Sequence, residues 1–287
     1  MDHADVGIVH PGSMGAQVAA QAVAAGARVR WSAQGRSAAT RERAERSGLA
    51  AVGSMAELTA RCGLVLSVCP PAAALDVARQ VAATGFDGVY VDANAVAPRR
   101  MEQIARVLEA AGATVVDGGI TGPPPRTAGT TRLYLSGDAP TVESVRTVFD
   151  GTLLTPVVLP GPLGRASALK LSFAAYNKIS HALAAEACAL AEDHGVLDDL
   201  LDLAAHLLPG TPLAEPQHLA TAGPRAWRWE PEMREIAGSW RDSGLPGTFA
   251  DAAAHTFGRW EDHKDDPDVP HRRLIADLLE ERPEASD

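Results

Sequence analysis

Short, almost wholly apolar runs alternate with longer alanine-rich segments over the first 160 residues of this 287-residue chain. The runs are residues 6–9, 27–31, 63–68, 88–92 and 114–117, with two more at 132–136 and 153–159. The segments between them, residues 14–25, 38–47, 72–83, 98–111 and 140–149, have the length of helical crossovers. Apolar strands joined by helices are typical of a parallel sheet covered on both faces. The first half is therefore predicted to be an α/β domain with a mostly parallel sheet.

The pattern changes after Pro160-Gly161-Pro162. Residues 163–192 contain no proline and, past Gly164, no glycine, and their many alanines and leucines favour one long helix. The rest of the chain has a helical pattern and no strand signal. We predict two domains, the α/β domain over residues 1–160 and an all-helical domain over residues 161–287 that begins with the long helix.

Charge and composition exclude several classes of protein. Lys and Arg number 26 against 36 Asp and Glu, a net charge of −10, which argues against nucleic acid or a membrane surface as a partner. No stretch reaches the roughly 18 apolar residues that a membrane span needs, and the first residues lack the basic region of an export signal. The cysteines and histidines show neither disulfide nor metal-ligand spacing. We expect a cytoplasmic protein without a metal site.

A glycine loop lies where the first strand should turn into the first helix. Gly12 and Gly15 have the spacing of the last two glycines of a dinucleotide fingerprint, in which the backbone approaches a pyrophosphate and helix N–H groups face the anion. An ordinary strand-to-helix turn can have the same spacing, but the start of a βαβ series favours the nucleotide site of a Rossmann-type fold. The loop residues predicted to hold the cofactor are His10 (in place of the first glycine), Pro11, Gly12, Ser13, Met14 and Gly15.

The end of the second strand indicates which dinucleotide binds. A protein that binds NAD offers an acid to the ribose hydroxyls about twenty residues after the loop, whereas residues 31–37 contain no acid. Arg36 carries a planar set of donors suited to a phosphate dianion, and Ser32 and Ser37 add hydroxyl donors. A surface arginine is usually only solvated, but this position predicts NADPH as the cofactor, with Arg41 as a further positive charge.

With this loop the chain resembles the β-hydroxyacid dehydrogenase superfamily. The first domain of that superfamily is like that of 6-phosphogluconate dehydrogenase; hydroxyisobutyrate dehydrogenases belong to it, and imine reductases share its plan. Val91-Asp92-Ala93-Asn94-Ala95 is similar to the superfamily's Asp-x-Ser-Thr turn, which implies that the Asn94 amide binds nicotinamide or substrate. Cys69 and Pro70, after the run at 63–68, are expected at the cofactor as well.

Two further motifs carry the resemblance. Asp117-Gly118-Gly119-Ile120-Thr121-Gly122-Pro123-Pro124 is similar to the substrate-binding Asp-x-Pro-x-Ser-Gly-Gly loop, which puts Thr121 and Gly122 at the substrate, although a simple Gly/Pro turn would look alike. The helix from Gly164 resembles the Gly-x-Gly-x-x-x-Lys-x-x-x-Asn helix, and Lys170 matches its catalytic lysine.

The lysine helix departs from that pattern at two places. Ala166 replaces the second glycine, and Ala174 replaces the asparagine four residues after Lys170. Asn177 follows Lys170 by seven residues, about two helical turns, and so lies on the same face. We expect Asn177 to take over part of the missing amide's role, and whether Lys178 contributes stays open.

Residues 226–236 resemble the C-terminal helical domain of a poorly characterised branch of the superfamily. Trp229, Met233 and Ile236 recur at helical spacing, which is more typical of a core than of a pocket. Because the family closes its active site with helices of this domain, Trp229 and Met233 are predicted to contact the substrate.

These features predict an NADPH-dependent oxidoreductase that acts on a small carbonyl or hydroxyl compound, with Lys170 as general acid/base. Enclosure among alanine and leucine is expected to lower the pKa of this amine toward neutrality. One alternative is an imine reductase, which the lysine at 170 disfavours. Another is a cofactor-binding protein without turnover, which His10 and Ala174 at motif positions favour. The identity of the substrate and the direction of the reaction stay open.

The long helix also bears on assembly. A helix of some thirty residues is about 45 Å long, more than a helical half-domain can cover alone. Its apolar faces would be covered best by a second copy, and the family does this by interlocking its C-terminal domains. We predict a homodimer.

Overall fold

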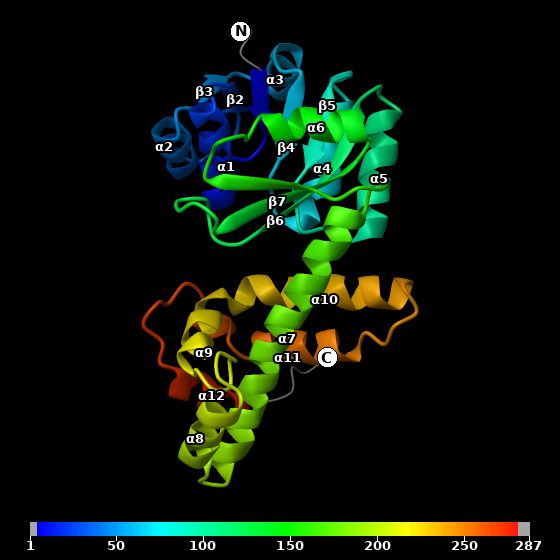
Figure 1. Cartoon of the computed structure of the whole chain (residues 1–287). Helices are drawn as coiled ribbons and strands as arrows, with labels where there is room; N and C mark the ends of the chain where they lie inside the picture. Colours follow the sequence, from blue (N-terminus) through cyan, green and yellow to red (C-terminus); the bar gives the residue numbers. More distant parts are fainter. Residues whose placement is uncertain (1–4, 281–287) are drawn as a thin grey trace, which may run out of the picture. The chain divides into compact units, whose positions relative to one another are not determined.

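The computed structural model describes residues 5–280 of the chain. They form two compact units, an α/β unit up to Leu171 and a helical unit from Ser172 (Figure 1). The predicted fold class is therefore confirmed. The units divide inside the long helix α7 (Arg165–Asp193), and the domain boundary after residue 160 stays a prediction. Within the described residues, no helix is long and apolar enough to cross a membrane.

One sheet organises the first unit, with the strand order β3-β2-β1-β4-β5-β6-β7-β8 within residues 5–158. β1 to β6 pair in parallel, β6 and β7 pair antiparallel, and β7 and β8 pair in parallel. The order reverses between β1 and β4, and such a switch point is where parallel α/β sheets bind ligands. The strands are β1 (Asp5–Ile8), β2 (Arg28–Ser32), β3 (Ala50–Val52), β4 (Leu64–Ser67), β5 (Val89–Asp92), β6 (Thr114–Thr121), β7 (Thr131–Gly137) and β8 (Leu154–Val158).

Helices cover both faces of this sheet, as the apolar strands require (Figure 1). One hydrophobic cluster joins the sheet to α1 and α6, and a second joins it to α3, α4 and α5. Val115 and Val116 illustrate the alternation, since these neighbours on β6 belong to opposite clusters. The short elements β3 and α3 were not predicted. The helices are α1 (Ser13–Ala24), α2 (Ala38–Arg46), α3 (Met55–Arg61), α4 (Ala74–Ala82), α5 (Pro98–Glu109) and α6 (Ala139–Thr147), with a 3-10 turn at Pro71–Ala73.

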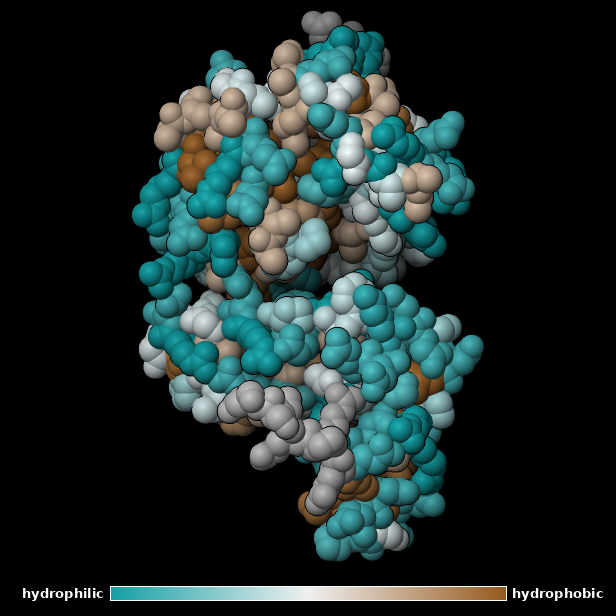
Figure 2. All heavy atoms as spheres, turned by 180° about the vertical axis from the view of Figure 1, so that it is seen from behind, coloured by the Kyte–Doolittle hydropathy of each residue, from teal (hydrophilic) through white to brown (hydrophobic). Residues whose placement is uncertain are grey.

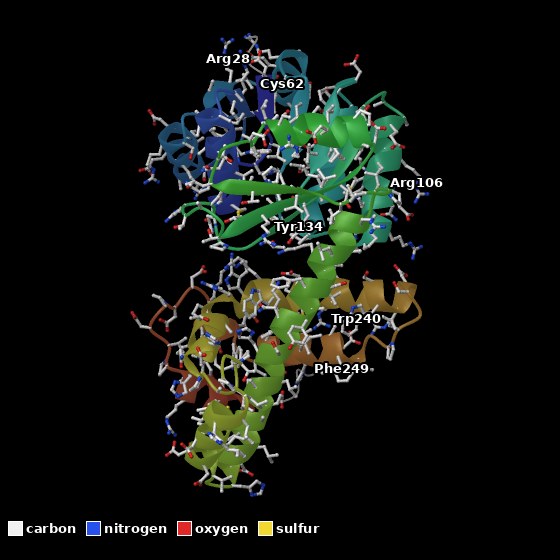
Figure 3. All side chains as sticks on the ribbon, viewed as in Figure 1. Arg28, Cys62, Arg106, Tyr134, Trp240 and Phe249 are labelled. Atoms are coloured by element: carbon white, nitrogen blue, oxygen red, sulfur yellow. The ribbon has the colours of Figure 1, made fainter. Side chains whose placement is uncertain are left out.

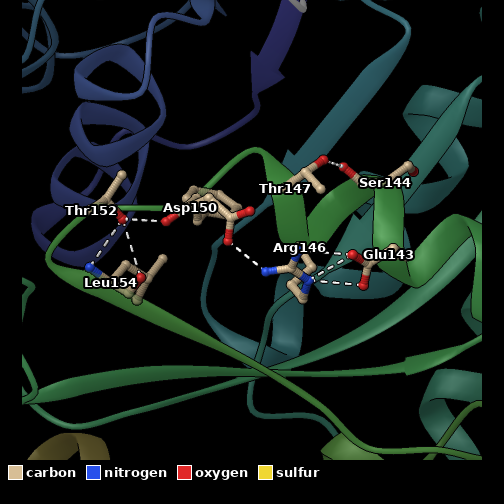
Figure 4. A network of polar contacts seen from close by, with 8 residues as sticks. Glu143, Ser144, Arg146, Thr147, Asp150, Thr152 and Leu154 are labelled. Carbon is tan, nitrogen blue, oxygen red and sulfur yellow. Dashed lines mark hydrogen bonds and ion pairs between the residues drawn. The ribbon is translucent and has the colours of Figure 1, made fainter.

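The turn from α6 into β8 is held by local polar contacts (Figure 4). Arg146 donates to Glu143 at 2.8 Å and to Asp150 at 2.5 Å. The Thr152 hydroxyl donates to the carbonyl of Phe149 at 2.8 Å and accepts the N–H of Leu154 at 3.3 Å. Exposed ion pairs of this kind contribute little to stability because water screens them.

A buried carboxylate joins α7 to the sheet. Asp117 on β6 is fully buried, and its Oδ2 accepts the N–H groups of Gly164 at 2.9 Å, Ala166 at 2.9 Å and Ser167 at 3.1 Å. Its Oδ1 accepts the Ser167 hydroxyl at 2.6 Å, and the Ser136 hydroxyl on β7 donates to Oδ2 at 3.0 Å. The first N–H groups of a helix lack partners within the helix and favour an anion. Asp117 therefore sets where α7 begins.

The second unit is helical, as predicted. In its core the indole N–H of the fully buried Trp260 donates to the carbonyl of Leu274 at 2.9 Å, and Phe257 lies between Trp260 and Trp229. α10 and α11 pack side by side, with Trp240 on α10 and Phe249 on α11 (Figures 1 and 3). Besides α7, the helices are α8 (Leu197–Leu207), α9 (Gln217–Ala222), α10 (Ala226–Asp242), α11 (Thr248–Gly258) and α12 (His271–Leu279), with 3-10 turns at Gly223–Arg225 and Glu261–His263.

Removal of the Asp117 carboxylate should destabilise the first unit strongly. Asp117→Ala leaves buried N–H and hydroxyl donors without an acceptor, and we expect the free energy of unfolding in urea to fall by about 3–5 kcal/mol. Asp138→Ala is the control, because Asp138 caps α6 in a similar way by accepting the Thr141 N–H at 3.1 Å, but on the exposed surface. Equal losses for the two variants would contradict the role of Asp117.

Candidate active site

The predicted cofactor and substrate residues of the first unit gather at one edge of its sheet. β1, β4, β5 and β6 run in parallel, so their carboxyl ends lie at the same edge. The segments that follow them contain most of the predicted residues. These are the glycine loop, Cys69 and Pro70, Asn94, and Thr121 with Gly122.

The glycine loop fits a dinucleotide. A Cβ built on Gly12 would meet no described atom within 4 Å, so the space beside it is open. A Cβ on Gly15 would lie 2.2 Å from the carbonyl oxygen of His10, so only glycine is accommodated there. The Gly12 N–H donates to the same oxygen at 2.8 Å, which makes the turn tight. Open space at the N-terminus of α1 suits a phosphate group.

Three arginines follow β2, and one of them contacts the glycine loop. Arg36 is half-buried, and its Nε is buried without a hydrogen-bond partner among the described residues. Arg41 donates to the carbonyl of Ala33 at 2.7 Å, and Arg43 donates to the carbonyl of Pro11 at 3.3 Å. Within residues 5–280, no carboxylate pairs with any of the three. Arg43 was not predicted; its signal was a second arginine on α2, two residues after Arg41. Cations without acid partners are what a phosphate site requires.

The two serines predicted beside Arg36 differ in their surroundings. Ser32, at the end of β2, is buried. Ser37 is exposed and caps α2, because its hydroxyl oxygen accepts the N–H of Thr40 at 3.3 Å. Their contacts with the cofactor stay predictions.

Asn94 ties the ends of β4 and β5 together. Its Oδ1 accepts the N–H of Cys69 at 2.5 Å, and its Nδ2 donates to the Ser67 hydroxyl at 3.2 Å and to Asp92 Oδ2 at 3.0 Å. The Asn94 side chain is buried, so the amide positions the Cys69-Pro70 loop from within. Its predicted contact with nicotinamide or substrate is not shown by this arrangement and stays a prediction.

Asp92 is an unusual carboxyl group. Burial raises its pKa from 3.8 to about 7, hydrogen bonds from Asn94 oppose the rise, and the nearby charge of Asp117 adds to it. The two acids are register partners on β5 and β6. In a low-dielectric interior the charge of Asp117 disfavours ionisation of Asp92.

Lys170 lies against the carboxyl end of β6. A Cβ built on Gly119 would be 2.9 Å from the carbonyl oxygen of Ala166 and 3.3 Å from the Cβ of Lys170. Gly119 therefore lets α7 pack directly on the strand backbone. The half-buried Lys170 lies against Gly119, which precedes Thr121 by two residues on β6. The signal for this contact was the Gly118-Gly119 pair.

The loop after β6 is shaped by the backbone. Gly122 has a φ of +101°, and a Cβ there would lie 2.1 Å from the carbonyl oxygen of Thr130. Gln21 on α1 holds the far side of the loop, since its Nε2 donates to the carbonyl of Pro125 at 3.2 Å while its Oε1 accepts the Leu153 N–H at 3.0 Å. Gln21 was not predicted. The half-buried Thr121 and the exposed Gly122 stay predicted substrate contacts.

The remaining predicted residues belong to the second unit. The buried Lys178 forms an ion pair with Glu232 and lies 5.5 Å from the Trp229 ring centre. Burial lowers the pKa of Lys178, and Glu232 opposes that shift. Met233 is fully buried, as expected of a core residue. Asn177 is exposed, and its carbonyl lies 2.6 Å from His181 Nδ1. Roles for Asn177, Trp229 and Met233 at a substrate stay predictions.

Comparison with known proteins identifies the family. Residues 5–152 match the family model described as the NAD binding domain of 6-phosphogluconate dehydrogenase. The chain belongs to this family. Residues 191–260 match a domain of unknown function, DUF1932. The predicted resemblance is thereby confirmed. A search of curated proteins found no match.

Solved structures with the same fold include dehydrogenases and imine reductases. A 3-hydroxyisobutyrate dehydrogenase of Mycobacterium tuberculosis with L-serine is 18% identical, with a TM-score of 0.77 over 96% of this chain and 99% of that one. Psf3 in complex with NADP+ and 2-OPP is 19% identical, with a TM-score of 0.69 over 95% and 99%. A Streptomyces aurantiacus imine reductase is 19% identical, with a TM-score of 0.55 over 96% and 100%.

The raised pKa of Asp92 gives a pH dependence of stability. Since the folded-state pKa of about 7 exceeds the ordinary 3.8, stabilisation from this group is complete below about pH 4 and is lost as pH rises to about 7, by at most about 1.4 kcal/mol per pH unit. In urea unfolding, Asp92→Asn should therefore gain stability relative to wild type over this interval. Asp76→Asn, at an exposed acid on α4, is the control. An Asp92→Asn difference that is equal at pH 4.5 and 7.5 would contradict the shift.

Proposed function

We propose that this chain is an NADPH-dependent oxidoreductase that transfers a hydride between the nicotinamide and a carbonyl or hydroxyl carbon of a small molecule, with Lys170 as general acid/base. The observation that carries the proposal is the packing of α7 on Gly119. It holds Lys170 at the sheet edge where the glycine loop of a family NAD-binding domain also lies.

The chain's own groups account for binding. Gly12 and the N-terminus of α1 would hold the pyrophosphate, since the space there is open. Arg36 would hold the 2′-phosphate that distinguishes NADPH from NADH, because its Nε has no partner among residues 5–280. The fold neighbour that contains NADP+ supports this choice. When bound, the cofactor supplies or accepts the hydride.

Proton transfer is the part assigned to Lys170. When the substrate is reduced, the ammonium group donates a proton to the oxygen that gains negative charge. When it is oxidised, the neutral amine removes the hydroxyl proton. Thr121 and Gly122, at the end of the strand against which Lys170 packs, would bind the rest of the substrate. A carbonyl is favoured over an imine because the lysine is retained at position 170.

We also propose a homodimer formed through the second unit. Phe173, Leu183 and Leu190 on α7 are 55%, 68% and 63% exposed. Together with Tyr176, they are separated along the helix by three, seven and seven residues. Spacings of three, four or seven residues are typical of a face that packs against another helix. The same face of α7 lines a groove of about 590 Å³, whose other wall includes Leu208, residues 210–213 and Trp229.

The second unit also has exposed leucines on α8. Leu203 and Leu207 on α8 are exposed, and hydrophobic atoms reach the surface at the end of the second unit where α8 lies (Figures 1 and 2). An apolar seam beside a groove is what a second copy of the helix would cover. The family's interlocked helical domains support this assignment.

Replacement of the lysine should abolish turnover without loss of binding. For a substrate found by NADPH oxidation with 2-keto, 3-keto, semialdehyde and cyclic imine compounds, Lys170→Ala should lower kcat about 10²- to 10⁴-fold. The dissociation constant of NADPH, measured by fluorescence, should stay within about twofold. Lys264→Ala, an exposed lysine of the second unit, is the control. Intact turnover by Lys170→Ala would disprove the assignment.

Charge on the α7 seam should separate the dimer. Wild-type protein should show about twice the 29.9 kDa chain mass in light scattering at 10 µM. The double variant Leu183→Glu/Leu190→Glu should be a folded monomer, since two buried carboxylates would lack partners. Leu153→Glu, at an exposed leucine of the first unit, is the control. A monomeric wild-type protein would refute the proposed assembly.

A further inference from the structure

His10 has a side chain where the dinucleotide fingerprint has a glycine. Its backbone fulfils the glycine's part in the turn, because its carbonyl accepts the Gly12 N–H at 2.8 Å. The imidazole is therefore an addition to the loop. Its Nδ1 is buried and has no hydrogen-bond partner among the described residues. Unpaired buried polar atoms are rare in native proteins and call for a partner.

A second unpaired atom belongs to a neighbouring group. Arg36 Nε is also buried without a partner in the described part of the chain, and the charge of Arg36 acts on His10. Burial, followed by this charge, lowers the pKa of His10 to about 4, so the ring is neutral at pH 7. A neutral ring keeps one N–H donor and does not repel the guanidinium. A group with several oxygen atoms could therefore form hydrogen bonds with both His10 and Arg36.

We propose that His10 determines cofactor specificity: together with Arg36 it binds the 2′-phosphate of NADPH. This inference rests on the proposed NADPH-dependent function. It adds a second residue to the phosphate site, at a position where the fingerprint has no side chain.

The position of Arg36 selects the 2′-phosphate over the pyrophosphate. β1 and β2 are parallel neighbours, with Ile8 opposite Trp31, so His10 and Arg36 follow adjacent strand ends. The ribose of a bound dinucleotide lies at the end of the second strand, whereas its pyrophosphate lies at the N-terminus of α1. The charge of Arg36 acts on the His10 ring, which associates His10 with the ribose side of the site. Burial of Arg36 Nε reduces its hydration, which strengthens a charge-assisted hydrogen bond.

The test uses ligands that differ only in this phosphate. Dissociation constants of 2′,5′-ADP and 5′-AMP are measured by calorimetry on the full chain, for wild type, His10→Gly, His10→Gln and Arg36→Ala. Arg28→Ala is the matched control, since Arg28 is an exposed arginine at the opposite, amino end of β2 (Figure 3). Circular dichroism verifies that each variant is folded.

We expect His10→Gly to weaken 2′,5′-ADP binding about tenfold or more, with 5′-AMP changed by less than about twofold. His10→Gln keeps a neutral hydrogen-bonding side chain and should retain 2′,5′-ADP binding within about threefold. Arg28→Ala should match wild type. A His10→Gly variant that binds 2′,5′-ADP like wild type, or that loses both ligands equally, overturns the proposal.

The design separates this failure from that of the proposed function. If wild type binds 2′,5′-ADP no better than 5′-AMP, or binds neither, the NADPH assignment fails and the role of His10 fails with it. If wild type prefers 2′,5′-ADP and Arg36→Ala loses the preference while His10→Gly keeps it, only the role of His10 is wrong. For a His10→Gly variant that does not fold, His10→Ala replaces it with the same expected loss.

Discussion

The carboxylate of Asp117 is the constraint on which the candidate site depends. It accepts N–H groups from the first turn of α7 and hydroxyls from β7 and α7. A fully buried carboxylate is tolerated only when such donors replace water. Because all the donors except the Ser136 hydroxyl come from the start of α7, the same contacts that satisfy the charge fix where this helix begins. Lys170 lies about one and a half turns after the start of α7, so its position depends on the contacts of Asp117.

Three glycines allow close backbone packing around the candidate site. Gly119 admits α7 to the face of β6, Gly15 admits the His10 carbonyl to α1, and Gly122 turns the chain into β7. At each position an added Cβ would meet backbone oxygen at less than 3 Å, so no side-chain rearrangement can relieve the clash. The site is therefore built from backbone proximity, and the polar side chains around it are placed by that framework.

Much of this fold could be predicted from the sequence because apolar runs and helical periods repeat over the first half of the chain. β3 and α3 were missed, since three residues at Ala50–Val52 carry no periodic signal. The predicted loops were found at one sheet edge because parallel strands place them there. The sequence could not show which groups form hydrogen bonds with each other. The amide of Asn94 bonds inward to Cys69 and Asp92, Gln21 bonds to Pro125, and Arg43 bonds to Pro11.

Asp92 and Asp117 differ in the hydrogen-bond donors that surround their carboxyl groups. The two acids are register partners on the neighbouring strands β5 and β6, and both are fully buried. Asp117 accepts hydrogen bonds from a helix N-terminus and from hydroxyl groups, whereas within residues 5–280 Asp92 accepts them only from the backbone and amide of Asn94. Donors stabilise the ionised form and burial destabilises it. At Asp92 burial outweighs the hydrogen bonds from Asn94, so the pKa of this acid is raised to about 7.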